Sequence, residues 1–530
     1  MPNKKPNFLF IITDQHRADH VACYGNAVVR TPHIDSLAAT GTRYERFYVA
    51  NPVCMSNRCS LMTGRMPSAH GVYSNGTSLS LDSRTFIQSL AAEHYKTALV
   101  GKSHLQTMTG RQPAWTPPAS DYAFDDNDLP LEANVTSRSG DGYRNEDPAS
   151  WEDPHFSVAV PYYGFGHVDL CTMHADRVGG NYTQWLKSKE GGWNEKRGPE
   201  NAIPDARYST PQAWRTQLPE ELYPSAYVGD KTIEFLQAHA ANAVDAPFFI
   251  QCSFPDPHHP FTPPGKYWDM YDPEEMELPA SFGEGGTRIE KFLHGQLRDG
   301  TAQRNAENPF AVTEREAKEA IALTYGMITM IDDQVGRILA ELDRLGLREN
   351  TIVIFTSDHG DYMGDHGLML KGPLHLHGML RVPFIWNDPA HKDAAVSGRL
   401  GQTIDIPVTV LERAGIKPYF GMQGSSLFGP EQETSGNARS TLLIEDDRQR
   451  INLGFSRFQK IRTLVTGRYR MTIGYPDAAN ELYDLELDPG EVNNLWDEPS
   501  AADIRHELVD ALTRKMLEMT DPVPLASSYA

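Results

Sequence analysis

Asn7-Phe8-Leu9-Phe10-Ile11-Ile12-Thr13-Asp14-Gln15, near the start of the chain, is a run of five apolar residues between polar ones. The run is short and does not alternate with polar residues, so it predicts a strand buried on both faces, as in a parallel sheet. Asp14 and Gln15 then lie at the carboxyl end of this strand, where open α/β sheets bind their ligands. The alternative for Asp14 is a helix cap or a turn residue.

A second apolar strand, predicted over residues 351–356, runs into Ser357-Asp358-His359-Gly360. Two buried strands therefore both end in residues that can bind a metal. Carboxylate oxygens at such positions suit a hard divalent cation. Lys371 follows in a glycine-containing segment, although a lysine considered alone is usually solvated.

Other patterns alternate between strands and helices along the chain. Strands are predicted over residues 97–100, 248–254 and 381–386, and helices over residues 85–94, 226–239, 313–345 and 404–414. Asp332 and Asp333 are expected on the solvated face of the helix over residues 313–345.

The length of 530 residues indicates one large domain and one smaller one. Residues 415–436 have the composition of a loop. Beyond them, two antiparallel strands over residues 461–467 and 468–474 and a helix over residues 502–519 predict a small C-terminal α+β domain. The predicted domains are residues 1–430 and 431–530.

Residues 105–225 are rich in Pro, Gly, Asp, Trp and Tyr and show little periodicity. Long irregular stretches inside compact chains are more often functional than structural, so an insertion that shapes the rim of a substrate pocket is predicted. Its aromatic side chains either stack on a ligand or fill a core. They are Tyr162, Tyr163, Phe165 and Trp185.

Asn51-Pro52-Val53-Cys54-Met55-Ser56-Asn57-Arg58 leads into a predicted helix over residues 56–62, closed by Gly64. Cys54 then precedes a helix N-terminus, where free backbone N–H groups and the helix dipole favour an anion. Arg58 is about one turn further on and is predicted to reach back toward Cys54. A cysteine so placed is electrostatically activated. The alternative is a buried structural cysteine beside a surface arginine.

Two more polar segments follow predicted strands. Lys102-Ser103-His104 comes after the strand over residues 97–100, and its alternative is an ordinary polar loop. His258-His259 comes after the strand over residues 248–254, between prolines that prevent a helix. A rigid surface turn is the alternative there.

The formal net charge of −21 argues against nucleic acid or an anionic membrane as a partner, and an anionic substrate requires a locally positive pocket. The five cysteines are odd in number and contain no CxxC pair, which argues against a disulfide scaffold or a zinc–thiolate site. A reducing compartment fits this pattern. The N-terminal apolar run is too short for a signal peptide or a membrane span, so a cytoplasmic protein is expected. The sequence is compatible with a homo-oligomer.

Four motifs occur in a characteristic order: Cys54-Met55-Ser56-Asn57-Arg58, Gly101-Lys102-Ser103-His104, Pro257-His258-His259-Pro260-Phe261 and Ser357-Asp358-His359-Gly360. In this the chain resembles the type I, formylglycine-dependent sulfatases of the alkaline-phosphatase superfamily, from Asn7 to about residue 495. The resemblance implies a large doubly wound, mostly parallel α/β sheet with helices on both faces. It also implies a smaller C-terminal α+β domain with an antiparallel sheet.

The resemblance implies hydrolysis of a small anionic sulfate ester to an alcohol and inorganic sulfate. In the family a maturation enzyme oxidises the signature cysteine, here Cys54, to formylglycine. One hydroxyl of the hydrated aldehyde, ionised by a single divalent metal, is the nucleophile, and the second hydroxyl allows sulfate to be expelled. Ser56 departs from the commonest motif, which has proline there, and this bears on how completely Cys54 is converted.

The resemblance also assigns the other site residues. The metal ligands beside Cys54 are Asp14, Gln15, Asp358 and His359. The metal is usually calcium, and manganese is the alternative because His359 stands where many sulfatases have asparagine. The resemblance implies that Arg58 steadies the nucleophile and that His104 orients it and takes its proton. Lys102 and Lys371 would hold the sulfate oxygens. His258 would protonate the leaving oxygen, and Asn75 would contact the substrate. His259 is the alternative to His258.

Three other functions remain as alternatives. Asp-Gln and Asp-His pairs also occur in choline sulfatases and in phosphonate monoester hydrolases, although the latter have Tyr and Thr in place of Lys102 and His104. The first alternative is therefore a phosphonate monoester or phosphodiester hydrolase. A two-metal phosphomonoesterase would need a second cluster of Asp and His ligands, and a silent binding protein would keep Cys54 as a thiol. Aryl, choline and carbohydrate sulfates are all open as substrates.

Overall fold

The computed structural model describes residues 4–111, 120–124, 131–133, 138–242, 246–305, 308–392, 394–428, 439–476 and 480–528. These residues form a nine-stranded central sheet in the order β11-β2-β10-β8-β1-β6-β3-β4-β5. In that order its strands are β11 (Ala395–Gln402), β2 (Thr42–Tyr48), β10 (Phe384–Asn387), β8 (Thr351–Ser357), β1 (Asn7–Thr13), β6 (Phe248–Ser253), β3 (Lys96–Lys102), β4 (His167–Thr172) and β5 (Gly179–Gly180).

β1 lies at the centre of the sheet and pairs in parallel with both β6 and β8. All of its residues are buried. Phe8 and Phe10 belong to the hydrophobic core on one face of the sheet, and Leu9 and Ile11 belong to the core on the other face. The predicted strand buried on both faces is confirmed, because successive side chains of a strand point to opposite faces.

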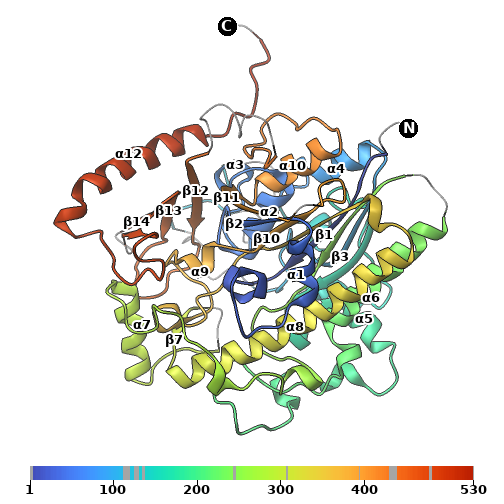
Figure 1. Ribbon diagram of the computed structural model, residues 1–530, viewed down its shortest axis with the longest axis horizontal. Coiled ribbons are helices and arrows are strands. Elements are labelled where there is room, and N and C mark those ends of the chain that lie inside the picture. The colour runs from blue at the N-terminus through green and yellow to red at the C-terminus, as the bar shows by residue number, and fades with distance from the viewer. Residues whose placement is uncertain are drawn as a thin grey trace.

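Helices cover both faces of the sheet, as a doubly wound fold requires (Figure 1). The core on one side contains residues of α1 (Pro32–Ala39), α5 (Asn181–Lys187), α6 (Pro224–Ala241) and α8 (Glu314–Arg344). The core on the other side contains residues of α2 (Cys54–Thr63), α4 (Phe86–Ala92) and α10 (Asp405–Arg413). β10 runs antiparallel to β8 and β2, and β5 runs antiparallel to β4, so the sheet is mixed but mostly parallel.

The central strands end close together, and this positions the site. The N–H of Asp14 donates to the carbonyl of Asp256, and the N–H of Asp358 donates to the carbonyl of Thr13, both at 3.1 Å. Gly101, near the end of β3, has φ +101°, and a Cβ there would lie 1.9 Å from the carbonyl oxygen of Ser253. Only glycine therefore allows β3 to approach the end of β6 so closely.

α2 begins at Cys54, so the prediction that Cys54 precedes the helix is corrected by two residues. Val53 is still extended, and its N–H donates to the Asn51 side chain at 2.8 Å. The Asn57 side chain accepts from the N–H of Ala50 at 3.0 Å. These side-chain hydrogen bonds hold the backbone before α2, so the helix begins at Cys54 rather than at the predicted Ser56. Gly64 ends it at φ +66°, as predicted.

Asp332 is fully buried, which corrects the prediction of a solvated face on α8. Its carboxylate accepts from the N–H groups of His33 at 3.1 Å and Ile34 at 2.8 Å. These are free donors in the first turn of α1. Burial raises the pKa of Asp332 to about 7. Asp332 is therefore a capping residue supplied by a neighbouring helix.

The segment over residues 105–225 contains β4 and α5, so the described part of it is not wholly irregular. β4 pairs in parallel with β3 and lengthens the main sheet. Its first residues are exposed or half-buried, and this lack of a continuous apolar run explains why the strand was not predicted. Tyr162, Tyr163 and Phe165 are buried in the core, which favours the core interpretation of these aromatics.

A second, four-stranded antiparallel sheet follows, as predicted for the C-terminal part. Its strands are β12 (Thr441–Asp447), β13 (Lys460–Thr466), β14 (Tyr469–Tyr475) and β15 (Glu481–Asp484). α12 (Ala502–Glu518) packs against them in a core that also includes Ala50, Met66 and Ile404. The predicted boundary at residue 430 lies outside the described residues. Among the described helices, none is long and apolar enough to cross a membrane.

Candidate active site

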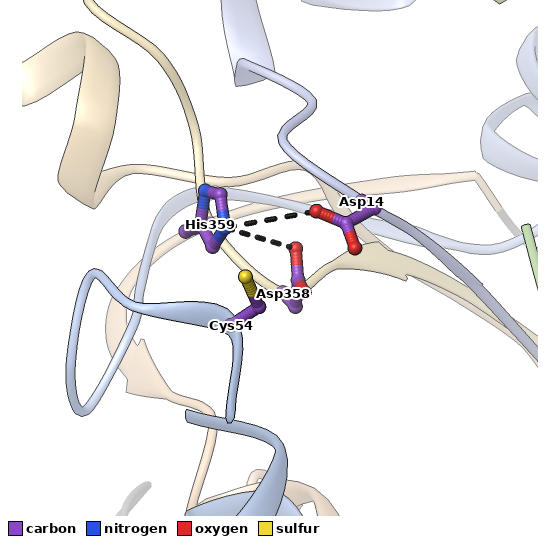
Figure 2. A group of neighbouring side chains, drawn as sticks. All are labelled: Asp14, Cys54, Asp358 and His359. Atoms are coloured by element: carbon purple, nitrogen blue, oxygen red, sulfur yellow. Dashed lines mark ion pairs between the residues drawn. The ribbon is translucent and has the colours of Figure 1, made fainter. Parts of the chain in front are cut away.

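The ends of β1 and β8 and the start of α2 contribute to one buried cluster. Figure 2 shows Asp14, Cys54, Asp358 and His359 turned toward a common point. One ligand atom from each of the four lies within 4.8 Å of the others. His359 Nε2 is 3.7 Å from Asp14 Oδ1 and 3.7 Å from Asp358 Oδ1. The structure thus brings together candidates that are separated by up to 345 positions in the chain.

Arg58 balances the negative charge of this cluster. Its Nε donates to Asp358 Oδ2 at 2.7 Å, and its Nη2 is 3.4 Å from Asp14 Oδ2. Its Nη1 donates to Ser253 Oγ at 2.9 Å. Burial would raise the pKa of Asp358, but the charge of Arg58 holds this pKa below its usual value. The pKa of Asp14, in contrast, is raised by burial and by the charge of Asp358. The guanidinium therefore binds the two carboxylates that lie beside Cys54.

Gln15 and Lys371 complete one side of the cluster. Gln15 has φ +62°, in the left-handed region, and its amide Oε1 accepts from Lys371 Nζ at 3.0 Å. Its Nε2 donates to Asp361, whose other oxygen accepts the backbone N–H of Leu370, beside Lys371. Lys371 Nζ is also 3.2 Å from His359 Nε2. The amide oxygen of Gln15 therefore faces the same space as the imidazole of His359.

Cys54 is 1% exposed. Its Sγ lies 3.5 Å from Lys371 Nζ and 4.0 Å from Asn75 Nδ2. Burial would raise the pKa of the Cys54 thiol, but the positive charges of Lys371 and Lys102 hold this pKa well below its usual range. The thiol at the first residue of α2 therefore lies beside two lysines that favour its ionised form.

Lys102 and His104 approach from the end of β3. Lys102 is fully buried, and its Nζ donates to Asp14 and, at 2.6 Å, to His174 Nε2. His104 has φ +58°, and its Nδ1 is buried without a hydrogen-bond partner among the described residues. Its backbone N–H donates to Glu146 at 2.9 Å. Glu146, from the segment over residues 105–225, therefore fixes the loop that carries His104.

The ring of His258 stacks on those of two other histidines. Its centroid is 3.5 Å from that of His174 at an interplanar angle of 6°, and 4.1 Å from that of His259 at 26°. His258 Nε2 is 3.0 Å from Lys371 Nζ. Burial and the Lys371 charge hold the pKa of His258 well below its usual range, so its ring is neutral in this state. His259 Nδ1, in contrast, is 3.0 Å from Gln15 Nε2.

Asp14, His174 and His258 form a second group of metal-competent side chains with ligand atoms within 4.8 Å. A metal binds an imidazole nitrogen along the lone pair, which lies in the ring plane. Two rings stacked face to face do not direct their lone pairs at one ion. The Lys102 ammonium also contacts both Asp14 and His174. This geometry does not suit the second metal that a two-metal phosphomonoesterase needs.

Three residues of the site were not predicted from the sequence: Glu146, His174 and Asp361. Asp361 lies three residues after Asp358 in the same motif, so its position next to a predicted metal ligand could have marked it as a site residue. Glu146 and His174 come from the irregular segment, where no periodicity or spacing marks them. They reach the site only through the tertiary fold.

Comparison with known proteins identifies the family of this chain. The family model described as Sulfatase matches residues 6–416, and the model described as N-sulphoglucosamine sulphohydrolase, C-terminal, matches residues 364–518. An arylsulfatase of Clostridium perfringens is 28% identical over 500 residues, covering 93% of this chain and 90% of that protein. An N-acetylglucosamine-6-O-sulfatase of Bacteroides thetaiotaomicron is 24% identical over 544 residues, covering 98% and 88%.

A phosphonate monoester hydrolase of Agrobacterium radiobacter has the same fold, with a TM-score of 0.73, 24% identity and coverage of 97% of this chain and 96% of that one. Fold and site together define a hydrolase whose centre combines buried carboxylates with lysines suited to an oxyanion. Because the family model spans most of the chain, the protein belongs to the sulfatase family of sulfuric ester hydrolases, within the alkaline-phosphatase superfamily.

Proposed function

We propose that this sulfatase works through a formylglycine made from Cys54 and a single divalent cation held by Asp14, Gln15, Asp358 and His359. The observation that carries the proposal is the position of Cys54. It is the first residue of a buried helix, its Sγ is grouped with Asp14, Asp358 and His359, and Lys371 Nζ lies 3.5 Å away. A merely structural cysteine has no need of such surroundings.

The donor set fits a hard cation. Asp14 Oδ1 is buried and has no hydrogen-bond partner among the described residues, although it lies 3.7 Å from His359 Nε2. An unpaired buried carboxylate oxygen is costly unless a cation compensates it. Two carboxylates, one amide oxygen and one imidazole suit calcium, with manganese as the alternative. When bound, the cation would lower the pKa of a coordinated hydroxyl and polarise the ester.

Formylglycine would supply a hydrated aldehyde, with one hydroxyl to attack sulfur and a second to let the product leave. Around it, Asn75 lies at Cys54 and would bind a sulfate oxygen. His104, whose Nδ1 has no partner among the described residues, would orient the nucleophile and take its proton. Arg58 acts through the two carboxylates, because it fixes their positions on either side of residue 54.

Lys102 and Lys371 would hold the sulfate oxygens and offset the charge that builds up in the transition state. His258 is the better candidate to protonate the leaving oxygen, because its Nε2 lies beside Lys371 Nζ next to Cys54. Its neutral ring must first take up a proton at Nε2 before it can act as the acid. His259 is directed toward Gln15 instead, at 3.0 Å. The substrate is therefore a small anionic sulfate ester whose alcohol departs on the His258 side.

The maturation step remains part of the proposal. Ser56, which replaces the usual proline of the motif, is buried and donates to the carbonyl of Val72 at 2.7 Å. It has a structural role in the finished protein that does not depend on how the maturation enzyme reads the motif. All five cysteines are unpaired.

Mass spectrometry of the peptide that contains Cys54 tests the modification. Conversion to formylglycine lowers its mass by about 18 Da relative to the thiol. We expect the converted fraction to track the rate of aryl sulfate hydrolysis across preparations, and Cys54→Ala to abolish both. Full activity with an unmodified thiol would reject the proposal.

A substrate comparison tests the reaction. We expect kcat/KM for an aryl sulfate to exceed that for an aryl phosphonate monoester, because Lys102 and His104 are both present. The reverse order would favour the phosphonate monoester hydrolase alternative. In the same assay, treatment with a chelator is expected to abolish turnover, and added Ca²⁺ or Mn²⁺ to restore it.

A further inference from the structure

We propose that His174 is a positioning residue that holds His258 and Lys102 in their working orientations, an inference that rests on the proposed sulfate ester hydrolysis. His174 lies just beyond β4, in the loop-rich segment. Nothing in the sequence marks it, yet it contacts two of the groups that surround Cys54. Its side chain is 13% exposed, so it lies at the edge of the buried site.

The first contact is with His258. The two rings are 3.5 Å apart and nearly parallel, at 6°. Because His259 stacks on His258 as well, and two rings cannot share one face of an imidazole, His258 lies between its two neighbours. A ring packed on both faces is hindered from tilting, which keeps its Nε2 directed at Lys371.

The second contact is with Lys102. His174 Nε2 lies 2.6 Å from Lys102 Nζ, which also donates to Asp14. An ammonium group has three donors, so two fixed acceptors define the direction of the third. His174 supplies the second of these two acceptors and therefore helps to determine which way the third N–H of Lys102 points.

The backbone around His174 supports a functional role. Met173 at φ +63° and Ala175 at φ +53° flank it, both in the left-handed region without being glycine. Such residues cost about 1 kcal/mol each and persist where the surroundings enforce them. Asp176, fully buried, anchors the loop through Trp214 and Thr216 at 3.0 and 2.9 Å. His174 therefore lies between two strained residues in a segment that Asp176 holds in place.

Three variants separate the two contacts. His174→Phe keeps a ring to stack on His258 but has no acceptor for Lys102. His174→Gln keeps an acceptor but no ring, and His174→Ala removes both. His167→Ala on β4 is the matched control, because that histidine is exposed and contacts Asp169 and the Phe235 ring rather than the groups around Cys54.

The kinetic test uses aryl sulfates whose phenols differ in pKa. We expect His174→Ala to lower kcat about 100-fold for the poorest leaving group and only a few fold for the best, with little change in KM, because acid assistance matters most when the leaving group is poor. His174→Phe should restore most of the kcat that His174→Ala loses with the poorest leaving group, and His174→Gln should not. A loss that is uniform across the series, a loss confined to KM, or rates equal to those of His167→Ala would overturn the proposal.

A second measurement does not need turnover. In histidine-labelled protein, the ring protons of His258 should be shifted upfield by the stacked ring in the wild type and in His174→Phe, and should move downfield in His174→Ala. Unchanged His258 resonances in His174→Ala would reject the stacking. If the wild type shows the shift but hydrolyses no sulfate ester, the proposed function fails while the positioning by His174 stands.

Discussion

Arg58 is the side chain that compensates the two buried carboxylates of this site. It is 1% exposed, and it faces two carboxylates, Asp14 and Asp358, that are fully buried. Removing one partner of a buried ion pair is strongly destabilising, because it leaves uncompensated charge in a medium of low polarity.

Arg58→Met should therefore lower the free energy of unfolding by about 3–5 kcal/mol, measured by urea denaturation in the presence of a chelator. The control is Arg514→Met, which removes an exposed ion pair with Asp510 and should leave the midpoint unchanged. Equal midpoints for the two variants would show that Lys102 alone compensates the carboxylates.

At this scale, the sequence predicts residues that follow a recognisable element. Asp14 and Asp358 end apolar strands, so their proximity follows from the geometry of a parallel sheet. His174 and Glu146 could not be found in the same way. Their contacts depend on where an irregular loop folds, which no local pattern encodes.

Among the elements, α1 depends on a neighbour for its cap. Asp332 on α8 accepts the N–H groups of His33 and Ile34, which have no partner within their own helix. A periodic pattern places Asp332 on a face of α8 but does not reveal what lies against that face, which explains the incorrect prediction of a solvated side chain.

Asp332→Ala should lower the free energy of unfolding by about 1–3 kcal/mol, because two buried donors lose their acceptor. Asp332→Asn keeps one acceptor oxygen and should cost less. Thermal denaturation of both variants checks this order. An alanine variant as stable as the asparagine variant would contradict the capping role.

The loop after β8 is tied to α7 (Arg288–Arg298) by a buried pair between His366 and Glu290. Although burial opposes it, the hydrogen bond and charge of Glu290 raise the pKa of His366 to about 9. The folded pKa exceeds the unfolded value near 6.5, so this contribution is complete below about pH 6.5 and is lost as pH rises through 9.

We therefore expect stability to fall between pH 7 and pH 10, and His366→Gln to flatten this part of the profile. The measurement is the urea midpoint at each pH for both proteins. Parallel profiles for wild type and variant would show that another group causes the loss.

For the whole molecule, the net charge of −21 repels the anionic ester that the family hydrolyses. Positive charge near Cys54 is largely offset by Asp14 and Asp358 in the same cluster. At long range the overall field therefore dominates, and salt screens it over about 10 Å at 0.1 M.

We expect kcat/KM for an anionic aryl sulfate to rise about twofold between 20 and 200 mM NaCl, with kcat unchanged. A fall with salt would mean that the local lysines attract the substrate more strongly than the whole protein repels it. A nonspecific salt effect would change kcat as well.

The burial of Cys54 also has a consequence in time. The side chains that enclose it include Asp358 and Lys371, which are synthesised about 300 residues later, a delay of roughly 15–60 s at the usual 5–20 residues per second. Until β8 emerges and pairs with β1, the cysteine motif is an open segment of nascent chain. Any enzyme that converts Cys54 has its best access in that interval, so faster translation downstream of α2 would shorten it and leave more protein with an unmodified thiol.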